Sequence, residues 1–294
     1  TYSPWVSFSQ LAEEWLNAQD DVQALCDFIN QRLAQPFEET REKTEPGLFK
    51  EKAKAAGPPM LVPKWTTLLV ATADTQGNND QDGYFWYTIR AWTNGYRSQL
   101  VDYGIANSKA ELLQRTINAQ IPFEGGGTAT PQILLIDSGG PRWFEIYQLA
   151  QSDGRIKPTK GASTQQVSMA QERIQKTHNV VLWLIDTEQS KDALHRLIHD
   201  PDKARWLPHK LVADDDQYAD QMASEAKMFD PQTGKEEWKT LPGQEKNNHI
   251  WDCEHQQVAA AWRYSMGIPL APEVPEQSAP PEPQTRPRLW GERH

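Results

Sequence analysis

The sequence is poor in cysteine and contains no long hydrophobic run. Its 294 residues include two cysteines, Cys26 and Cys253, which excludes a disulfide-rich scaffold and any zinc site built from four cysteines. The mean hydropathy is −0.73, and no stretch approaches the roughly 18 consecutive apolar residues that a membrane-spanning helix needs. We therefore expect no membrane span and no membrane partner.

A phosphate-binding loop for ATP is missing from the sequence as well. The single Gly-Lys pair, Gly234-Lys235, is followed by Glu236 and has no glycine at the upstream position of that motif. The sequence also contains no zinc-finger or helix-turn-helix signature of the kind that reads DNA bases. These residues therefore exclude a P-loop motor and give no sign of sequence-specific DNA binding.

Positive charge is scarce too. Lys and Arg number 30 against 40 Asp and Glu, which gives a formal net charge of −10 and a pI near 5.2. Because contacts to nucleic-acid phosphates come from Lys and Arg, this balance disfavours a protein that binds nucleic acid by electrostatics alone. It is compatible with an enzyme that acts on nucleic acid through metal ions held by acidic residues.

The N-terminal part, residues 1–62, predicts a short helical arm followed by a charged linker. Capping-box patterns at Ser7 and at Asp20 predict two helices between residues 7 and 34. From residue 35 to 64 the chain is charged and rich in proline, which is typical of a connector.

Residues 63–267 predict an α/β domain. Apolar runs and turn signals predict strands at 68–73, 84–92, 98–103, 132–136 and 180–185. The first three are joined by hairpin turns, and helices follow the third and the fourth. Antiparallel hairpins followed by β-α-β crossovers predict a mixed five-stranded sheet with helices on both faces.

Two further segments complete the domain organisation. A long helix is expected from Asn247 to Met266, with Trp251, His255, Val258 and Trp262 on one stripe. Residues 268–294 hold seven of the 21 prolines, so we expect a disordered Pro-rich tail.

Three aspartates are candidates for metal chemistry. Asp74 ends the first expected strand, Asp137 ends the fourth, and Asp252 lies in the first turns of the long helix. If the first and fourth strands are parallel neighbours, their ends place Asp74 beside Asp137, and a helix across that edge adds Asp252. Three converging carboxylates repel one another unless divalent cations neutralise them. Two such cations are the usual device for in-line displacement at a phosphodiester.

Simpler interpretations of these acids stay open. An aspartate after a strand is often a turn former, and Asp186 also ends an apolar run, which shows how common the pattern is. Asp252 could serve merely as an acidic residue near a helix N-terminus.

A basic segment and a pair of histidines allow two further, less specific predictions. Residues 155–161 form a basic loop in which Arg155, Lys157 and Lys160 are candidate contacts to a DNA backbone, the alternative being a solvated surface loop. His195 and His199 stand one helical turn apart, but no third metal ligand with suitable spacing is evident, which favours a surface helix.

Five segments, in order, resemble the terminase large subunit family of tailed phages in its GpA-type branch. Pro36-Phe37-Glu38-Glu39 resembles the stretch that follows the motor of that family. The others are Thr72-Ala73-Asp74-Thr75-Gln76, Leu100-Val101-Asp102-Tyr103-Gly104, Ile136-Asp137-Ser138-Gly139-Gly140, and Asn247-Asn248-His249-Ile250-Trp251-Asp252-Cys253-Glu254.

The resemblance implies an RNase H-like fold and a metal-dependent endonuclease that cuts concatemeric double-stranded viral DNA during packaging. It implies that Asp74, Asp137 and Asp252 hold two Mg²⁺ or Mn²⁺ ions and are the catalytic residues. It also implies a place in the cytoplasm of a bacterial host, with the terminase small subunit, the portal and a packaging ATPase domain, absent from these residues, as partners.

Two rival functions stay open. The same fold and metals would serve a strand-transfer or junction-resolving enzyme, which joins strands rather than hydrolysing them. A non-catalytic docking module that links a packaging motor to a portal or small subunit would show no stabilisation by Mn²⁺.

Overall fold

The structure is a computed structural model. It describes residues 6–19, 22–34, 39–79, 82–163, 166, 168–230, 235–244 and 247–266. The expected helix cap at Asp20 and the expected Pro-rich tail at 268–294 lie outside the described residues.

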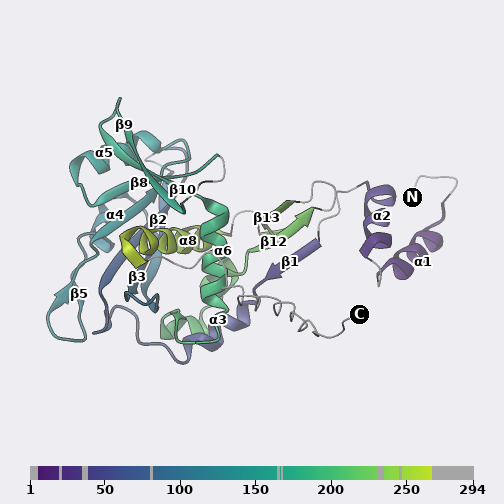
Figure 1. The fold of residues 1–294 in the computed structure, drawn as a ribbon, viewed down its shortest axis with the longest axis horizontal. Helices are drawn as coiled ribbons and strands as arrows, with labels where there is room; N and C mark the ends of the chain where they lie inside the picture. The colour runs from purple at the N-terminus through teal and green to yellow at the C-terminus, as the bar shows by residue number, and fades with distance from the viewer. Residues whose placement is uncertain are drawn as a thin grey trace, which may run out of the picture.

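The body of the molecule is built on a mixed sheet of eight strands in the order β11-β4-β3-β2-β7-β8-β10-β9 (Figure 1). In chain order the strands are β2 (Leu68–Gln76), β3 (Tyr84–Trp92), β4 (Ser98–Ala106), β7 (Ile133–Asp137), β8 (Ile156–Gly161), β9 (Ala170–Gln175), β10 (Val180–Ile185) and β11 (Trp206–Leu207).

The centre of this sheet has the predicted connectivity. Strands β2, β3 and β4 form an antiparallel meander, and β2 pairs with β7 in parallel. Ala73 is paired with Ile136, so the next residues on these two strands, Asp74 and Asp137, come side by side at one edge. The condition for Asp74 and Asp137 to meet, that the first and fourth predicted strands are parallel neighbours, is therefore fulfilled.

The prediction of five strands is wrong, because the sheet contains eight. The main omission is β8, which lies between β7 and β10 and occupies the segment expected to be a basic loop. This strand has no apolar run, since Lys157 and Lys160 interrupt it, yet it buries Ile156 and Thr159 between two parallel neighbours. Strands β9 and β11 carry equally weak patterns.

Helices cover both faces of the sheet, as predicted. The helices of the described residues are α1 (Phe8–Ala18), α2 (Val22–Arg32), α3 (Pro46–Ala53), α4 (Lys109–Arg115), α5 (Trp143–Ser152), α6 (Thr187–Ile198), α7 (Asp216–Met222) and α8 (His249–Ala261), with a short 3-10 helix at Lys210–Asp214 and a π-helical turn at Trp262–Met266. Alternate strand residues enter two separate cores. Val70 and Leu135 pack toward α8 and α6, whereas Ala71 and Leu134 pack with Ile146 of α5.

Helix α8 is an interior helix. Figure 1 shows it across β2 and β3, with α6 beside it. Its polar side chains are paired with the elements around it: Glu254 binds Arg90, Gln256 accepts from Thr159, and Gln257 donates to the carbonyls of Val70 and Thr88. Satisfied polar contacts of this kind permit a helix rich in Glu and Gln to be buried.

Two smaller units flank the sheet. A three-stranded sheet joins β1 (Glu39–Lys43), β12 (Glu225–Asp230) and β13 (Lys235–Thr240), and a two-stranded ribbon joins β5 (Ile121–Pro122) to β6 (Thr128–Ala129). The helical arm is formed by α1 and α2, and Ser7 and Gln10 make the predicted capping box.

The segment expected to be a connector is partly regular structure. It contains β1, which pairs with β12, and α3, whose Phe49 and Ala53 are fully buried in the core. Because charged residues surround Phe49 in the sequence, the composition of this segment did not indicate that one face of α3 is buried. Among the described residues no helix combines the length and apolar character needed to cross a lipid bilayer.

Candidate active site

The three predicted aspartates line one cavity of about 180 Å³ at the edge of the large sheet. Asp74 comes from the end of β2, Asp137 from the end of β7, and Asp252 from the first turn of α8. The other lining residues are Thr159, Lys160, Gly161, Ile185, Thr187, His255 and Gln256. Acids separated by as much as 178 positions in the sequence therefore meet at one place.

Asp74 is buried and held on one side. His249 Nδ1 lies 2.8 Å from its Oδ2, and Gln76 Nε2 donates to the same oxygen at 2.7 Å. The imidazole is stacked on Trp86, with ring centroids 5.9 Å apart, which fixes its orientation. Since both contacts fall on Oδ2, Oδ1 is left without a donor among the described residues.

Asp137 ends β7 in a tight turn. Gly139 N donates to its Oδ1 at 3.1 Å, and a Cβ at position 139 would lie 3.3 Å from that oxygen, so glycine keeps the carboxylate uncrowded. Burial raises the pKa of Asp137 to about 6, and the nearby negative charge of Asp74 adds to the shift. The carboxylate therefore lies in an environment that disfavours its own charge.

Asp252 has partners on both oxygens. Asn248 Nδ2 donates to Oδ2 at 3.0 Å, and Lys191 Nζ lies 3.4 Å from Oδ1. Burial raises the pKa of Asp252 to about 7; the Lys191 ammonium opposes this shift, and Asp74 and Glu225 reinforce it. Burial disfavours the charged form of Lys191, but the attraction of Asp252 and Glu225 outweighs it and the pKa of Lys191 is raised.

The donor set fits hard divalent cations. Three carboxylates line this small cavity, and the raised pKa values of Asp137 and Asp252 mean that a cation in place of their protons would relieve the cost of their charge. Among the described residues no group of three or more His, Cys, Asp or Glu side chains is placed so that it could hold a metal ion. Mg²⁺-type sites rarely depend on such a group, because they use one or two carboxylates with water and substrate phosphate.

Sequence reasoning did not identify the residues that position the acids. Asn248 and His249 stand in the segment that surrounds Asp252, so their proximity in sequence was a usable signal. Lys191 and Glu225 come from α6 and β12, and no local pattern connects either of them to the site.

Two residues with open interpretations are now placed. His255 lines the cavity, with Nδ1 3.0 Å from Ser190 Oγ and Nε2 3.7 Å from Asp252 Oδ1, and burial keeps its pKa well below the usual value. Asp186 instead caps α6 by accepting from Gln189 N, which is the structural role that a strand-terminal aspartate often has.

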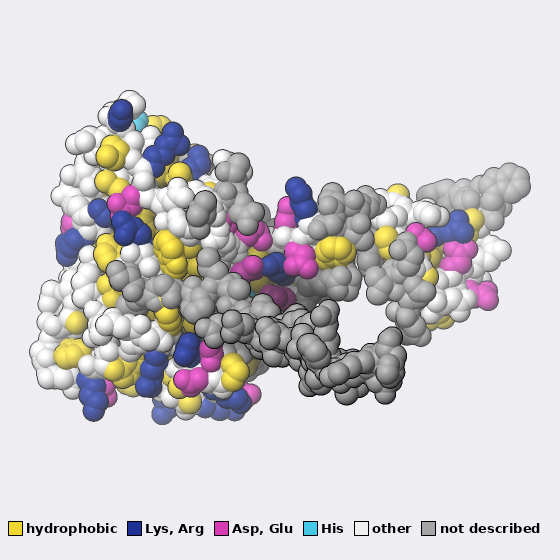
Figure 2. Space-filling model, viewed as in Figure 1, with side chains coloured by type: hydrophobic (Ala, Val, Ile, Leu, Met, Phe, Trp, Pro, Cys, Tyr) yellow, Lys and Arg dark blue, Asp and Glu magenta, His cyan; other side chains and the backbone are white. Residues whose placement is uncertain are grey.

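The predicted basic residues are spread along β8. Lys160 lines the cavity, and its charge lowers the pKa of Asp137. Arg155 lies at the other end of the strand, ion-paired with Asp153. Figure 2 shows further Lys and Arg side chains gathered near β9, where Arg173 and Lys176 are exposed.

The two histidines of α6 have separate partners. His195 Nδ1 lies 3.1 Å from Glu42 Oε2, and His199 Nε2 lies 2.9 Å from Thr44 Oγ1. His195 packs against both His199 and Trp238, so this helix face is not the solvent-exposed one that the sequence suggested.

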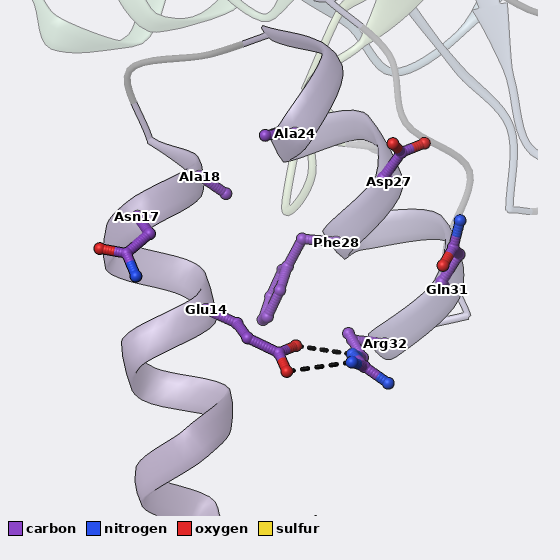
Figure 3. Close-up of a pocket in the computed structure, with 8 residues that line it drawn as sticks. All are labelled: Glu14, Asn17, Ala18, Ala24, Asp27, Phe28, Gln31 and Arg32. Carbon is purple, nitrogen blue, oxygen red and sulfur yellow. Dashed lines mark hydrogen bonds and ion pairs between the residues drawn. The ribbon is translucent and has the colours of Figure 1, made fainter.

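A second cavity of about 380 Å³ lies between α1 and α2 (Figure 3). Its side includes Phe28 and an ion pair in which Arg32 donates to Glu14 at 2.6 and 3.0 Å. None of the residues that line this cavity also lines the cavity of the three aspartates.

Comparisons with known proteins agree with one another. A family model described as "Terminase large subunit gpA, endonuclease domain" matches residues 1–269. The chain is 29% identical over 213 residues to the terminase large subunit of Enterobacteria phage P21, covering 68% of this chain and 32% of that protein. It is 24% identical over 204 residues to that of Escherichia phage lambda, covering 66% and 31%. The chain thus spans about a third of the length of these relatives.

Solved structures were compared as well. The nuclease domain of the large terminase subunit gp2 of bacterial virus Sf6 has 13% identity and a TM-score of 0.42, covering 76% of this chain and 97% of that one. A variant of the same domain with manganese and beta-thujaplicinol has 13% identity and a TM-score of 0.41, covering 70% and 90%.

Proposed function

This chain belongs to the gpA endonuclease-domain family of phage terminase large subunits, and we propose that it is a divalent-metal-dependent endonuclease that hydrolyses double-stranded DNA. The observation that carries the proposal is the meeting of Asp74, Asp137 and Asp252, from three elements, around one cavity. In this proposal the domain cuts concatemeric DNA while viral genomes are packaged in the cytoplasm of a bacterial host.

The proposed scaffold is RNase H-like. Its supporting feature is the central strand order β4-β3-β2-β7-β8, an antiparallel meander followed by parallel strands. In this arrangement the ends of β2 and β7 present their acids at the same edge, and α8 crosses that edge with the third. The scaffold thereby converts three distant sequence positions into one site.

Two Mg²⁺ or Mn²⁺ ions are the proposed cofactors, held by Asp74, Asp137 and Asp252. When bound, such ions activate a water molecule and stabilise the leaving oxygen of the phosphodiester. The chain itself orients the ligands: His249 and Gln76 hold Asp74, and Gly139 holds Asp137.

Substrate contact is assigned to the basic residues of β8 and β9. Lys160 lies at the cavity and would bind the phosphate next to the one that is cleaved. Lys157 and, farther from the cavity, Arg155 would extend this contact along the strand. With a net charge of −10 the domain needs further affinity, which the small subunit, the portal and the ATPase domain of the packaging complex would supply.

The test is cleavage of a supercoiled plasmid in Mn²⁺, Mg²⁺ or EDTA. The wild-type chain is compared with Asp137→Asn and with Asp186→Asn, a matched control because Asp186 also ends a strand and asparagine still caps a helix. We expect metal-dependent nicking and linearisation that are lost in Asp137→Asn and kept in Asp186→Asn.

Other results would favour the rival functions. Joined or branched products would indicate strand transfer or junction resolution instead of hydrolysis. An inert wild-type chain whose melting temperature Mn²⁺ does not raise would indicate a docking module.

A further inference from the structure

The third acid, Asp252, is one member of a closed ring of four side chains, the others being Lys191, Glu225 and Asn248. Lys191 Nζ lies 2.6 Å from Glu225 Oε2 and 3.4 Å from Asp252 Oδ1. On the other side Asn248 Nδ2 lies 3.0 Å from Glu225 Oε1 and 3.0 Å from Asp252 Oδ2. The ring joins α6, β12 and α8, and it occupies both oxygens of Asp252.

The two oppositely charged members of this ring, Lys191 and Glu225, are almost completely buried. Their side chains are 8% and 3% exposed. A charge so enclosed is destabilising unless partners compensate it, so a lysine that only covered surface would extend its ammonium into solvent. Lys191 instead directs its ammonium to two carboxylates, one of which faces the acid-lined cavity.

The neighbouring ion pair offers a comparison within the same interface. Lys227 of β12 lies 2.6 Å from Asp192 of α6, with 13% and 31% of the two side chains exposed. It links the same two elements, but its lysine pairs with Asp192, whereas Lys191 lies beside Asp252. A merely structural link between α6 and β12 is therefore already present one residue along α6.

The three aspartates consequently differ in the partners that surround their carboxylates. Asp74 receives both of its contacts on Oδ2, from the Gln76 amide and the His249 imidazole, and Asp137 is held by backbone. Asp252 alone among the three predicted acids has a lysine ammonium within 4 Å. A cation that approaches Asp252 must therefore compete with a buried ammonium held at that carboxylate, whereas one between Asp74 and Asp137 meets only Lys160, which is exposed and makes no ion pair with either aspartate among the described residues.

We propose that Lys191 is a positioning residue that makes the metal site asymmetric. One divalent ion binds tightly on the strand-borne acids, and a second binds weakly on Asp252, because Lys191 neutralises that carboxylate until the second ion arrives. This inference rests on the proposed metal-dependent function and deepens it. It assigns the order in which the site is loaded to the ring formed with Glu225 and Asn248.

Mn²⁺ binding to the full chain tests the proposal without reference to cleavage. Isothermal titration and Mn²⁺ electron paramagnetic resonance are recorded for wild type, Lys191→Met, Lys191→Arg and the control Lys227→Met. For wild type we expect two ions whose affinities differ by tenfold or more. Lys191→Met should tighten the weaker one about tenfold, whereas Lys191→Arg and Lys227→Met leave the difference in place.

Glu225→Gln supplies an independent variant in case Lys191→Met fails to fold. Removing the Glu225 charge leaves Lys191 to pair with Asp252 alone, so the weaker Mn²⁺ affinity should fall further. An unchanged weaker affinity in Lys191→Met or in Glu225→Gln would overturn the role of Lys191, and so would two equal affinities in wild type. If wild type binds no Mn²⁺ at all, the metal-dependent function fails as well.

Discussion

The strand-borne acids and the helix-borne acid reach the same cavity by different physical routes. Asp74 and Asp137 are adjacent because β2 and β7 are parallel neighbours in register, so the sheet alone determines their separation. Asp252 depends on α8, which is held in place by contacts to β3, α6 and β12. Strand pairing within the sheet therefore places two of the three acids, whereas the packing of a helix against the sheet places the third.

The dependence of the helix-borne acid on packing can be broken at Arg90. This fully buried side chain donates to both oxygens of Glu254 on α8, at 2.8 and 3.0 Å. Arg90→Met would leave Glu254 buried without its countercharge, and we expect a loss of about 3–5 kcal/mol in the free energy of unfolding, measured with urea.

The arm provides the matched control for Arg90. Arg32 and Glu14 form a bidentate pair of the same kind, with side chains 43% and 40% exposed. Arg32→Met should cost less than about 1 kcal/mol, because water screens an exposed pair. Equal losses for the two variants would contradict the claim that Arg90 anchors α8.

Substitution of Asp74 and of Asp252 compares a strand-borne acid directly with the helix-borne one. Asp74→Asn and Asp252→Asn should each reduce the plasmid cleavage rate about 10²- to 10³-fold, equivalent to roughly 3–4 kcal/mol of transition-state stabilisation. Their Mn²⁺ titrations should differ, since Asp74→Asn loses the tighter ion and Asp252→Asn keeps it. Loss of the tighter ion in both variants would mean that the acids act as one undivided site.

A smaller effect is expected where His249 supports Asp74. His249→Phe keeps the ring on Trp86 but removes the donor to Asp74 Oδ2. We expect the tighter Mn²⁺ affinity to fall about tenfold, the lower end of what such supporting residues contribute. His178→Phe, within the aromatic cluster around Trp143, is the control, and an equal fall there would point to a general packing effect.

The smallest expected effect concerns pH and the metal-free protein. The pKa of Asp137 is about 6 in the folded chain, against an ordinary value of 3.8. Its protonated form therefore favours folding at low pH, and this contribution is lost as the pH rises through about 6.

Asn at position 137 cannot ionise. In EDTA at pH 8, Asp137→Asn should therefore be more stable than wild type by about 1 kcal/mol, or roughly 2–4 °C in melting temperature. The gap should close at pH 4, and a melting temperature below that of wild type at pH 8 would contradict the electrostatic explanation.

What the sequence predicted well was governed by local pattern and by the direction of strands. The apolar runs that end at Asp74 and Asp137 predicted both strands, and the Ser7 capping box predicted the start of α1; the parallel pairing of the two strands entered only as a condition, which the structure fulfils. The position of Asp252 near these acids rested on the resemblance, since spacing alone does not dock a helix.

What the sequence did not predict was governed by tertiary context. Strand β8 has few apolar residues because its neighbours β7 and β10 supply the hydrophobic burial, and Phe49 of α3 is one buried ring in a charged segment. Lys191 and Glu225 meet only after α6 and β12 have packed against α8. Such partners leave no periodic trace in the chain.

The enclosure of α8 has a consequence for the timing of biosynthesis. Within α8, Asp252 is the one residue that is partly exposed, and every strand of the large sheet precedes this helix in the chain. A nascent chain that has completed the sheet still lacks both the helix that fills its core face and the third acid. Because domains acquire their structure as units during synthesis, the acid site forms as one of the last events in making the domain, and a nascent chain that ends before α8 lacks the complete acid cluster.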